Sequence, residues 1–249
     1  MAKWNDPQPT RTGFGASPSL DGTTAGRAGY DMGLRRHMLS IYNYMASGVL
    51  LTGIVALLFA RSGLAASIMM GGGILSWIII LSPLAIVFAM SFGANRFSTA
   101  TLQLMFWGFA TLMGLSMSTI FLVYTGQSIA TTFFATAGAF AGLSLFGYTT
   151  KKDLSGFGSF LIMGVVGILI AMVVNMFLQS SVLQMVVSVL GVLIFAGLTA
   201  YDTQRLKMQY YQLAGTDFAG KAIVLGALSL YLDFINMFQF LLSFLGSRE

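Results

Sequence analysis

The chain has 249 residues, of which 56% are hydrophobic and only 8% are charged, whereas a soluble globular domain carries roughly 25% charged residues. Because a soluble fold of this length cannot hide so much apolar surface, the composition excludes a water-soluble domain and predicts a polytopic membrane protein. The basic residues that give the net charge of +5 lie between apolar runs, which is typical of membrane topology and excludes a nucleic-acid partner. The absence of Cys excludes disulfides and thiolate sites.

Residues 1–30 are rich in Gly, Ser, Thr and Pro and show no apolar periodicity, so they are predicted to form a disordered cytoplasmic tail. Residues 31–249 are predicted to form one all-α transmembrane domain of seven helices, because the apolar runs are unbroken and near the ~20 residues that cross a bilayer. Barrel strands would show short alternating segments instead. The predicted spans cover residues 38–60, 74–92, 98–124, 128–148, 157–178, 182–203 and 222–245.

The orientation follows from the basic residues. With seven spans, all of the 13 Lys and Arg residues except Arg61 and Arg248 fall on the side of the N-terminus. Because Lys and Arg concentrate on the cytoplasmic side, the N-terminus is predicted to be cytoplasmic and the C-terminus to lie outside. Six spans followed by a re-entrant seventh segment remain the alternative.

Two acidic residues lie within predicted spans, Asp202 at the cytoplasmic end of the sixth and Asp233 inside the seventh. A carboxylate at the bilayer centre costs about 2.5–3.5 kcal/mol on insertion scales, so a functional reason is expected. Helical spacing puts Ser229 and Asn236 on the face of Asp233, and Thr199 on the face of Asp202. Both carboxylates are therefore predicted to face one internal space. The structural alternative is that each only holds helices together by hydrogen bonds.

Three ordered stretches carry a resemblance to a known family: "GYTTKKDLSGFG" (147–158), "LTAYDTQRLK" (198–207) and "LGALSLYLDFINMF" (225–238). They resemble the bacterial branch of the Bax-inhibitor family of membrane proteins. The resemblance implies a seven-helix fold in which the seventh helix is central within the other six. It also implies a multi-pass protein of the inner (plasma) membrane that acts as a pH-sensitive calcium leak channel, with calcium as the permeant ion and no cofactor.

The resemblance further assigns residues. The family's pH-sensing pair of aspartates corresponds to Asp202 and Asp233, and an Arg linked to that pair in some members corresponds most closely to Arg96. We expect the pair to share a proton and close the path at low pH. At higher pH the two carboxylates would repel each other, part the helices and bind calcium transiently, since hard cations prefer carboxylate oxygens.

Two other functions compete with the channel. One is a non-transporting modulator of a membrane protease or of a stress response, which would make a membrane protease the protein partner. The other is an intramembrane aspartyl protease, which also needs two aspartates on neighbouring helices. Tyr201-Asp202 matches the first half of that signature, but Tyr231-Leu232 stands before Asp233 where Gly-x-Gly is required. We therefore expect the chain not to be an enzyme.

Overall fold

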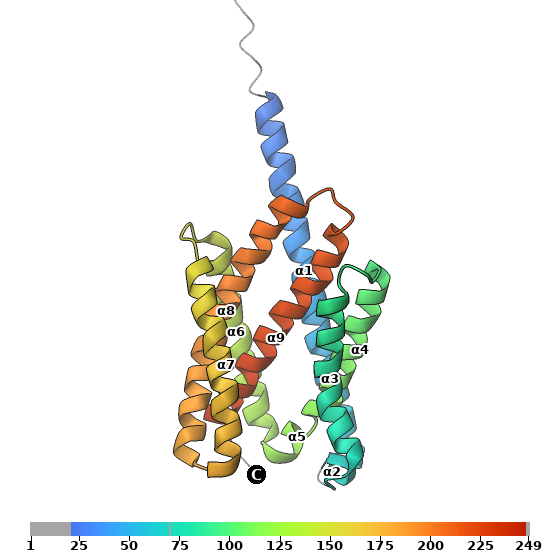
Figure 1. Ribbon diagram of the computed structural model, residues 1–249, viewed down its shortest axis with the longest axis vertical. Coiled ribbons are helices and arrows are strands. Elements are labelled where there is room, and N and C mark those ends of the chain that lie inside the picture. Colours follow the sequence, from blue (N-terminus) through green and yellow to red (C-terminus); the bar gives the residue numbers. More distant parts are fainter. Residues whose placement is uncertain (1–20, 70, 248–249) are drawn as a thin grey trace, which may run out of the picture. The chain divides into compact units, whose positions relative to one another are not determined.

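The structure is a computed structural model that describes residues 21–69 and 71–247, with side chains described from residue 32 onward. Every regular element in these ranges is a helix, and the helices follow one another as shown in Figure 1. They are α1 (Asp21–Arg61), α2 (Leu64–Met69), α3 (Ile74–Gly93), α4 (Thr99–Met117), α5 (Ile120–Val123), α6 (Gly126–Thr149), α7 (Ser155–Leu178), α8 (Ser181–Leu213) and α9 (Ala219–Leu245).

Seven stretches in the described residues are long and apolar enough to cross a membrane, which confirms the seven predicted spans. Their ends lie close to the predicted ones, with one exception that bears on function. The sixth span continues as helix to Leu213, past the predicted end at residue 203. The third span combines α4 and α5, which are separated by a turn at Ser118 and Thr119.

The first helix also begins earlier than the predicted transmembrane domain. Residues 21–30, which the sequence assigns to a disordered tail, are helical and continue into α1. Because no proline lies between Pro18 and Pro83, nothing local ends the helix in this region. Residues 1–20 of the predicted tail lie outside the described residues, so their disorder stays a prediction.

Side-chain caps stabilise the first turns of several helices where the chain must turn. Ser98, Thr125 and Ser180 accept hydrogen bonds from backbone N–H groups in the first turns of α4, α6 and α8. At the other end of the α7–α8 turn, Gln179 adopts a left-handed backbone conformation (φ 50°) and closes α7. This two-residue turn brings α7 and α8 together as an antiparallel pair.

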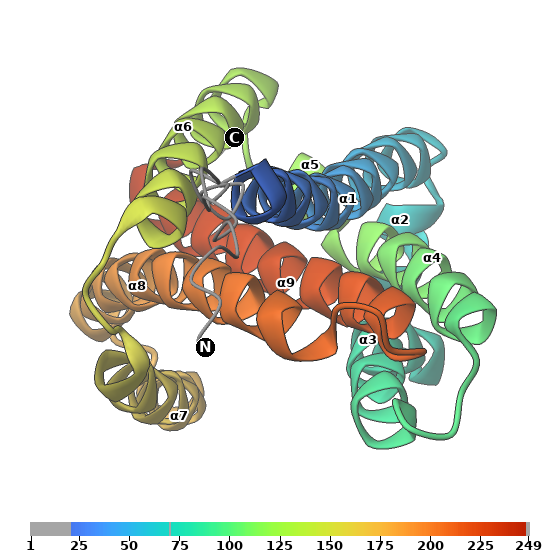
Figure 2. The same cartoon turned by 90° about the horizontal axis from the view of Figure 1, so that it is seen from above.

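Among the helices from α2 to α9, the most extensive packing is that of α8 against α9, and α8 also packs against α6 and α7. Figure 2 shows α7 beside α8 and away from α3 and α4. Of the 18 consecutive residues that are most apolar in each span, 11% are buried in α7 and 61% in α9. Thus α7 is the most exposed of the spans and α9 the most buried. The predicted enclosure of the seventh span by all six others stays a prediction, although α9 packs against α4 and α6 as well as α8.

Tyr231 of α9 marks the centre of the core. Its side chain is fully buried and lies edge-on to Phe106 and Phe109 of α4. Its hydroxyl is 2.6 Å from Oγ1 of Thr52 in α1, and Thr52 in turn donates to the carbonyl of Ala110 in α4 at 2.8 Å. This chain of hydrogen bonds satisfies the buried hydroxyls and ties α1, α4 and α9 together.

Candidate functional site

The faces of α8 and α9 that carry the predicted site contact each other between Ser188 and Asp202 of α8 and between Ser229 and Ser243 of α9. At one end Ser188 Oγ donates to Ser243 Oγ at 3.0 Å, and at the other end Ser229 Oγ donates to Asp202 Oδ2. These two contacts fix an antiparallel register, in which Asp233 lies level with Leu198, next to Thr199. Since one residue rises about 1.5 Å along a helix, the two carboxylates are offset by about one turn.

Asp202 is held in a closed set of three side chains. It is buried (6% exposed), accepts the hydrogen bond from Ser229, and its second oxygen is 3.4 Å from Nη2 of Arg205. The same Nη2 donates to Ser229 Oγ at 3.2 Å. Thus Ser229 of α9 binds both members of an ion pair on α8, and this contact closes the two helices against each other.

Arg205 belongs to this candidate site, although the sequence pattern does not predict it there. The predicted end of the sixth span at residue 203 places Arg205 in the loop that follows, but α8 continues through it and its side chain turns back to Asp202. The signal was present in the sequence, because residues three apart on a helix face each other.

Asp233 is buried to a similar degree (5% exposed) but is less well satisfied. Among the described residues, Asp233 Oδ2 and Arg205 Nε are the two buried side-chain polar atoms without a hydrogen-bond partner. One is an acceptor and the other a donor, and Asp233 lies within electrostatic reach of both Asp202 and Arg205. Unpaired buried polar atoms cost about 1–3 kcal/mol each, so this site retains unused capacity for a proton, a water or an ion.

The other predicted neighbours lie at different distances from this centre. Thr199 is fully buried and donates to the carbonyl of Phe195, one turn earlier on α8. Asn236 donates to the carbonyl of Leu232 and lines a cavity beside α7. No hydrogen bond joins the carboxyl groups of Asp202 and Asp233 directly in the described residues, so a shared proton stays a prediction.

Arg96 is separate from the carboxylates. It is exposed in the turn between α3 and α4, and within the described residues it makes no ion pair with Asp202 or Asp233. Lys221 instead joins that turn to α9, since its Nζ donates to the carbonyls of Ala94 (3.3 Å) and Asn95 (3.4 Å). The cation beside the carboxylates is therefore Arg205, and Lys221 fixes the start of α9.

Two of the stretches that carry the family resemblance bind each other on the same side as Asp202. The side-chain amide of Gln204 donates to the carbonyl of Lys152 and accepts from the backbone N–H of Leu154, both at 2.8 Å. Lys207 donates to the carbonyl of Tyr148 at 2.8 Å, at the end of α6. Hydrogen bonds from Ser155 hold the pKa of Asp153 in this connection below its usual range. The connection between α6 and α7 is thus fastened to α8.

Metal-ligating side chains do not gather elsewhere. Across the described residues no three His, Asp or Glu side chains lie close enough to hold an ion together. Two carboxylates alone leave most of the six to eight oxygen positions around calcium to water or backbone.

Known proteins are similar to this chain over most of its length. The family described as "Inhibitor of apoptosis-promoting Bax1" matches residues 34–249. An uncharacterized protein of Caulobacter vibrioides is 48% identical over 231 residues, which cover 88% of this chain and 91% of that protein. The inner membrane protein YbhL of Escherichia coli is 43% identical over 219 residues, which cover 87% of this chain and 94% of that protein. The chain therefore belongs to the Bax-inhibitor family of membrane proteins.

Proposed function

We propose that the protein is a pH-sensitive calcium leak channel of the inner membrane, with its N-terminus in the cytoplasm, and that Asp202 and Asp233 control it. The observation that carries this proposal is the pairing of a satisfied carboxylate with an unsatisfied one at the extensive contact between α8 and α9. The similarity to an inner membrane protein of Escherichia coli supports the location.

In this proposal the channel is closed while Asp202, Ser229 and Arg205 remain in contact. While Asp233 keeps its proton, Arg205 has a single negative charge beside it and holds the α8–α9 contact together. Arg205 is the one cation that the described residues place beside the pair. With Asp233 neutral, the charges of Asp202 and Arg205 balance each other, so no unpaired charge is left in the membrane interior.

A rise in pH removes the proton from the pair and changes this balance. Two negative charges then compete for Arg205, and repulsion between them favours separation of α8 from α9. Both carboxylates become available to a hard divalent cation, which prefers oxygen ligands. The expected result is greater calcium flux at higher pH.

The test is calcium flux into liposomes that contain only the purified protein, measured across a pH series. Asp202→Asn and Asp233→Asn should each flatten the pH dependence, because an amide keeps most hydrogen bonds but cannot ionise. Asp217→Asn is the matched control, since Asp217 is exposed in the turn before α9 and should leave the profile unchanged. Wild-type profiles for both site variants would overturn the assignment of the sensor.

The same liposomes distinguish the channel from its main competitor. A modulator of a membrane protease would fold normally but conduct no calcium in the absence of its partner. Flux that equals that of protein-free liposomes at every pH would therefore reject the channel. The sequence before Asp233 does not match the signature of an intramembrane aspartyl protease, and no proteolysis is expected.

A further inference from the structure

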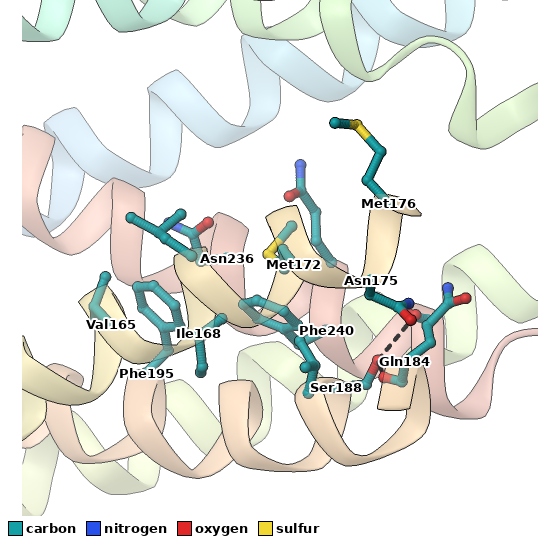
Figure 3. Close-up of a pocket in the computed structure, with 14 residues that line it drawn as sticks. Val165, Ile168, Met172, Asn175, Met176, Gln184, Ser188, Phe195, Asn236 and Phe240 are labelled. Atoms are coloured by element: carbon teal, nitrogen blue, oxygen red, sulfur yellow. Dashed lines mark hydrogen bonds between the residues drawn. The ribbon is translucent and has the colours of Figure 1, made fainter. Parts of the chain in front are cut away.

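A second polar site lies on the opposite side of Asp233 from Ser229. A cavity of about 420 Å³ opens between α7, α8 and α9, and Figure 3 shows Asn175, Gln184 and Ser188 towards one end of it and Asn236 near Phe195 towards the other. The polar side chains that line it are Asn175, Gln184, Ser188, Asn236, Gln239 and Ser243. All six belong to spans that are apolar enough to cross a membrane.

Much of this polarity is unsatisfied within the protein. Asn175 accepts from the backbone N–H of Ser180 and so supports the α7–α8 turn. In contrast, the side-chain amides of Gln184 and Gln239 form no hydrogen bond with any described residue, and Asn236 uses only its N–H group. A neutral amide that faces hydrocarbon without a partner costs roughly 1–3 kcal/mol, so lipid chains are poor occupants of this cavity.

Water fits the cavity better. Its volume is many times the ~10–15 Å³ of such space that one water requires, and each water would find several amide or hydroxyl partners. The polar wall carries no charge, so it would wet the cavity without trapping an ion. From Ser243 near the α7–α8 turn to Asn236, the wall extends for about 10 Å along α9.

Two aromatic rings also line the cavity. Phe195 of α8 and Phe240 of α9 stack with ring centroids 5.9 Å apart, and Phe195 is buried. Gly191 provides the space for Phe240, because a Cβ atom there would lie 2.5 Å from the ring. Asp233 lies on the same face of α9, one turn from Asn236 on the side away from Ser243.

We propose that this cavity is a hydrated vestibule through which a cation, still carrying water, approaches Asp233 from the side of the α7–α8 turn. The buried ring of Phe195, against which Phe240 stacks, lies level with Asn236 and forms the dry constriction between the vestibule and the carboxylates. Hydrophobic constrictions of this kind control ions by losing their water. Only the identity of the cargo rests on the proposed channel function, since hydration of the vestibule can be measured without transport.

The chain has no cysteine, so single cysteines can be introduced without removing any native thiol. Asn236→Cys and Ser243→Cys place thiols on the cavity wall. The matched controls are Met237→Cys, at a fully buried position, and Phe244→Cys, at a position exposed outside the cavity. A membrane-impermeant cationic methanethiosulfonate reagent is applied to right-side-out and to inside-out vesicles, and the rate of modification is measured.

We expect cysteines at 236 and 243 to react at least about tenfold faster than their controls, because the reactive thiolate forms in water and not in lipid. The fast reaction should occur in one vesicle orientation only, that in which the α7–α8 turn faces the reagent. Rates as slow as those of the controls in both orientations would show a dry or lipid-filled cavity and overturn the proposal. Fast modification from both sides would overturn the constriction.

Calcium flux through the same variants separates this inference from the proposed function. Modification at position 236 adds a positive charge one turn from Asp233 and should reduce flux severalfold, whereas treatment of the Met237→Cys control should leave flux unchanged. A reactive vestibule in liposomes that never conduct would reject the channel but keep the hydrated site. Flux that survives complete modification at position 236 would show that ions take another path and would overturn the role proposed for this cavity.

Discussion

Ser229 of α9 hydrogen-bonds to both members of the Asp202–Arg205 ion pair of α8. One hydroxyl therefore donates to a carboxylate and accepts from a guanidinium, across the extensive contact between α8 and α9. The arrangement makes the α8–α9 contact sensitive to any change of charge on these three side chains or on Asp233 beside them.

Removal of the hydroxyl should loosen this contact. We expect Ser229→Ala to raise calcium flux at low pH, where the contact otherwise keeps the path closed, and to lower stability by about 1–2 kcal/mol, since hydrogen bonds to charged groups are lost. Ser243→Ala is the matched control, because it removes the hydroxyl contact to Ser188 at the other end of the same interface. Equal effects of the two variants on flux at low pH would contradict a special role for Ser229.

Arg205 should set the pH at which the path opens. Arg205→Gln removes the cation beside the pair, so the second negative charge becomes costlier and the rise in flux should move to higher pH. Lys207→Gln removes an equal charge two residues later, where the side chain instead binds the carbonyl of Tyr148. The control should keep the wild-type midpoint, and flux measured at low ionic strength should show the difference most clearly.

The two carboxylates should act as a unit. The double variant Asp202→Asn, Asp233→Asn is expected to have a pH profile no flatter than either single variant, because one substitution already prevents the state with two negative charges. Flux for the four proteins, measured in parallel, gives the coupling between the sites. Strictly additive effects would indicate two independent titrating groups.

Close approach of α6 and α8 should depend on Gly147. A Cβ atom at this position would lie 2.2 Å from the carbonyl oxygen of Ala200, and a backbone atom cannot move aside as a side chain can. Gly147→Ala should therefore destabilise the protein by about 1–3 kcal/mol. Gly138→Ala on the same helix meets nothing within 4 Å and should be neutral or stabilising, by up to about 1 kcal/mol. Thermal unfolding in detergent provides the comparison.

The orientation of the chain can be tested independently of transport. The charge pattern predicts a cytoplasmic N-terminus and an external C-terminus. A reporter that is active only outside the cytoplasm should therefore be active after Glu249 and in the α7–α8 turn, and inactive in the α6–α7 connection. Loss of activity after Glu249 alone would indicate that the last segment re-enters the membrane instead of crossing it.

Hydrophobicity and helical spacing predicted much of this molecule. The spans are long apolar runs, and Ser229, Asp233 and Asn236 fall on one face of α9 as their spacing indicates. The predicted end of the sixth span, at residue 203, was wrong for the helix, because hydropathy detects the apolar part of a helix and not its polar continuation. Residues beyond 203 are polar, yet they remain helical as α8 continues. That error hid Arg205, whose side chain folds back along the helix to Asp202.

The cavity beside Asn236 could not be predicted from spacing alone. Its walls come from three helices, and its existence depends on how closely α7 approaches α9, which no local pattern encodes. Similarly, the sequence predicted two carboxylates facing one space but not that Asp202 would be satisfied by Ser229 while Asp233 keeps an oxygen without a partner. These are consequences of register between helices.

The bonds of Gln204 limit how the two halves of this interface can separate. Because Gln204 fastens the α6–α7 connection two residues after Asp202, and Lys207 fastens the end of α6, α8 cannot slide without carrying α6 and α7 along. Opening at Ser229 should thus be a shear of α9 against a rigid block of three helices. The distance between two spectroscopic probes, one in the α6–α7 connection and one in the turn before α9, would then report the state of buried carboxylates from the aqueous side of the membrane.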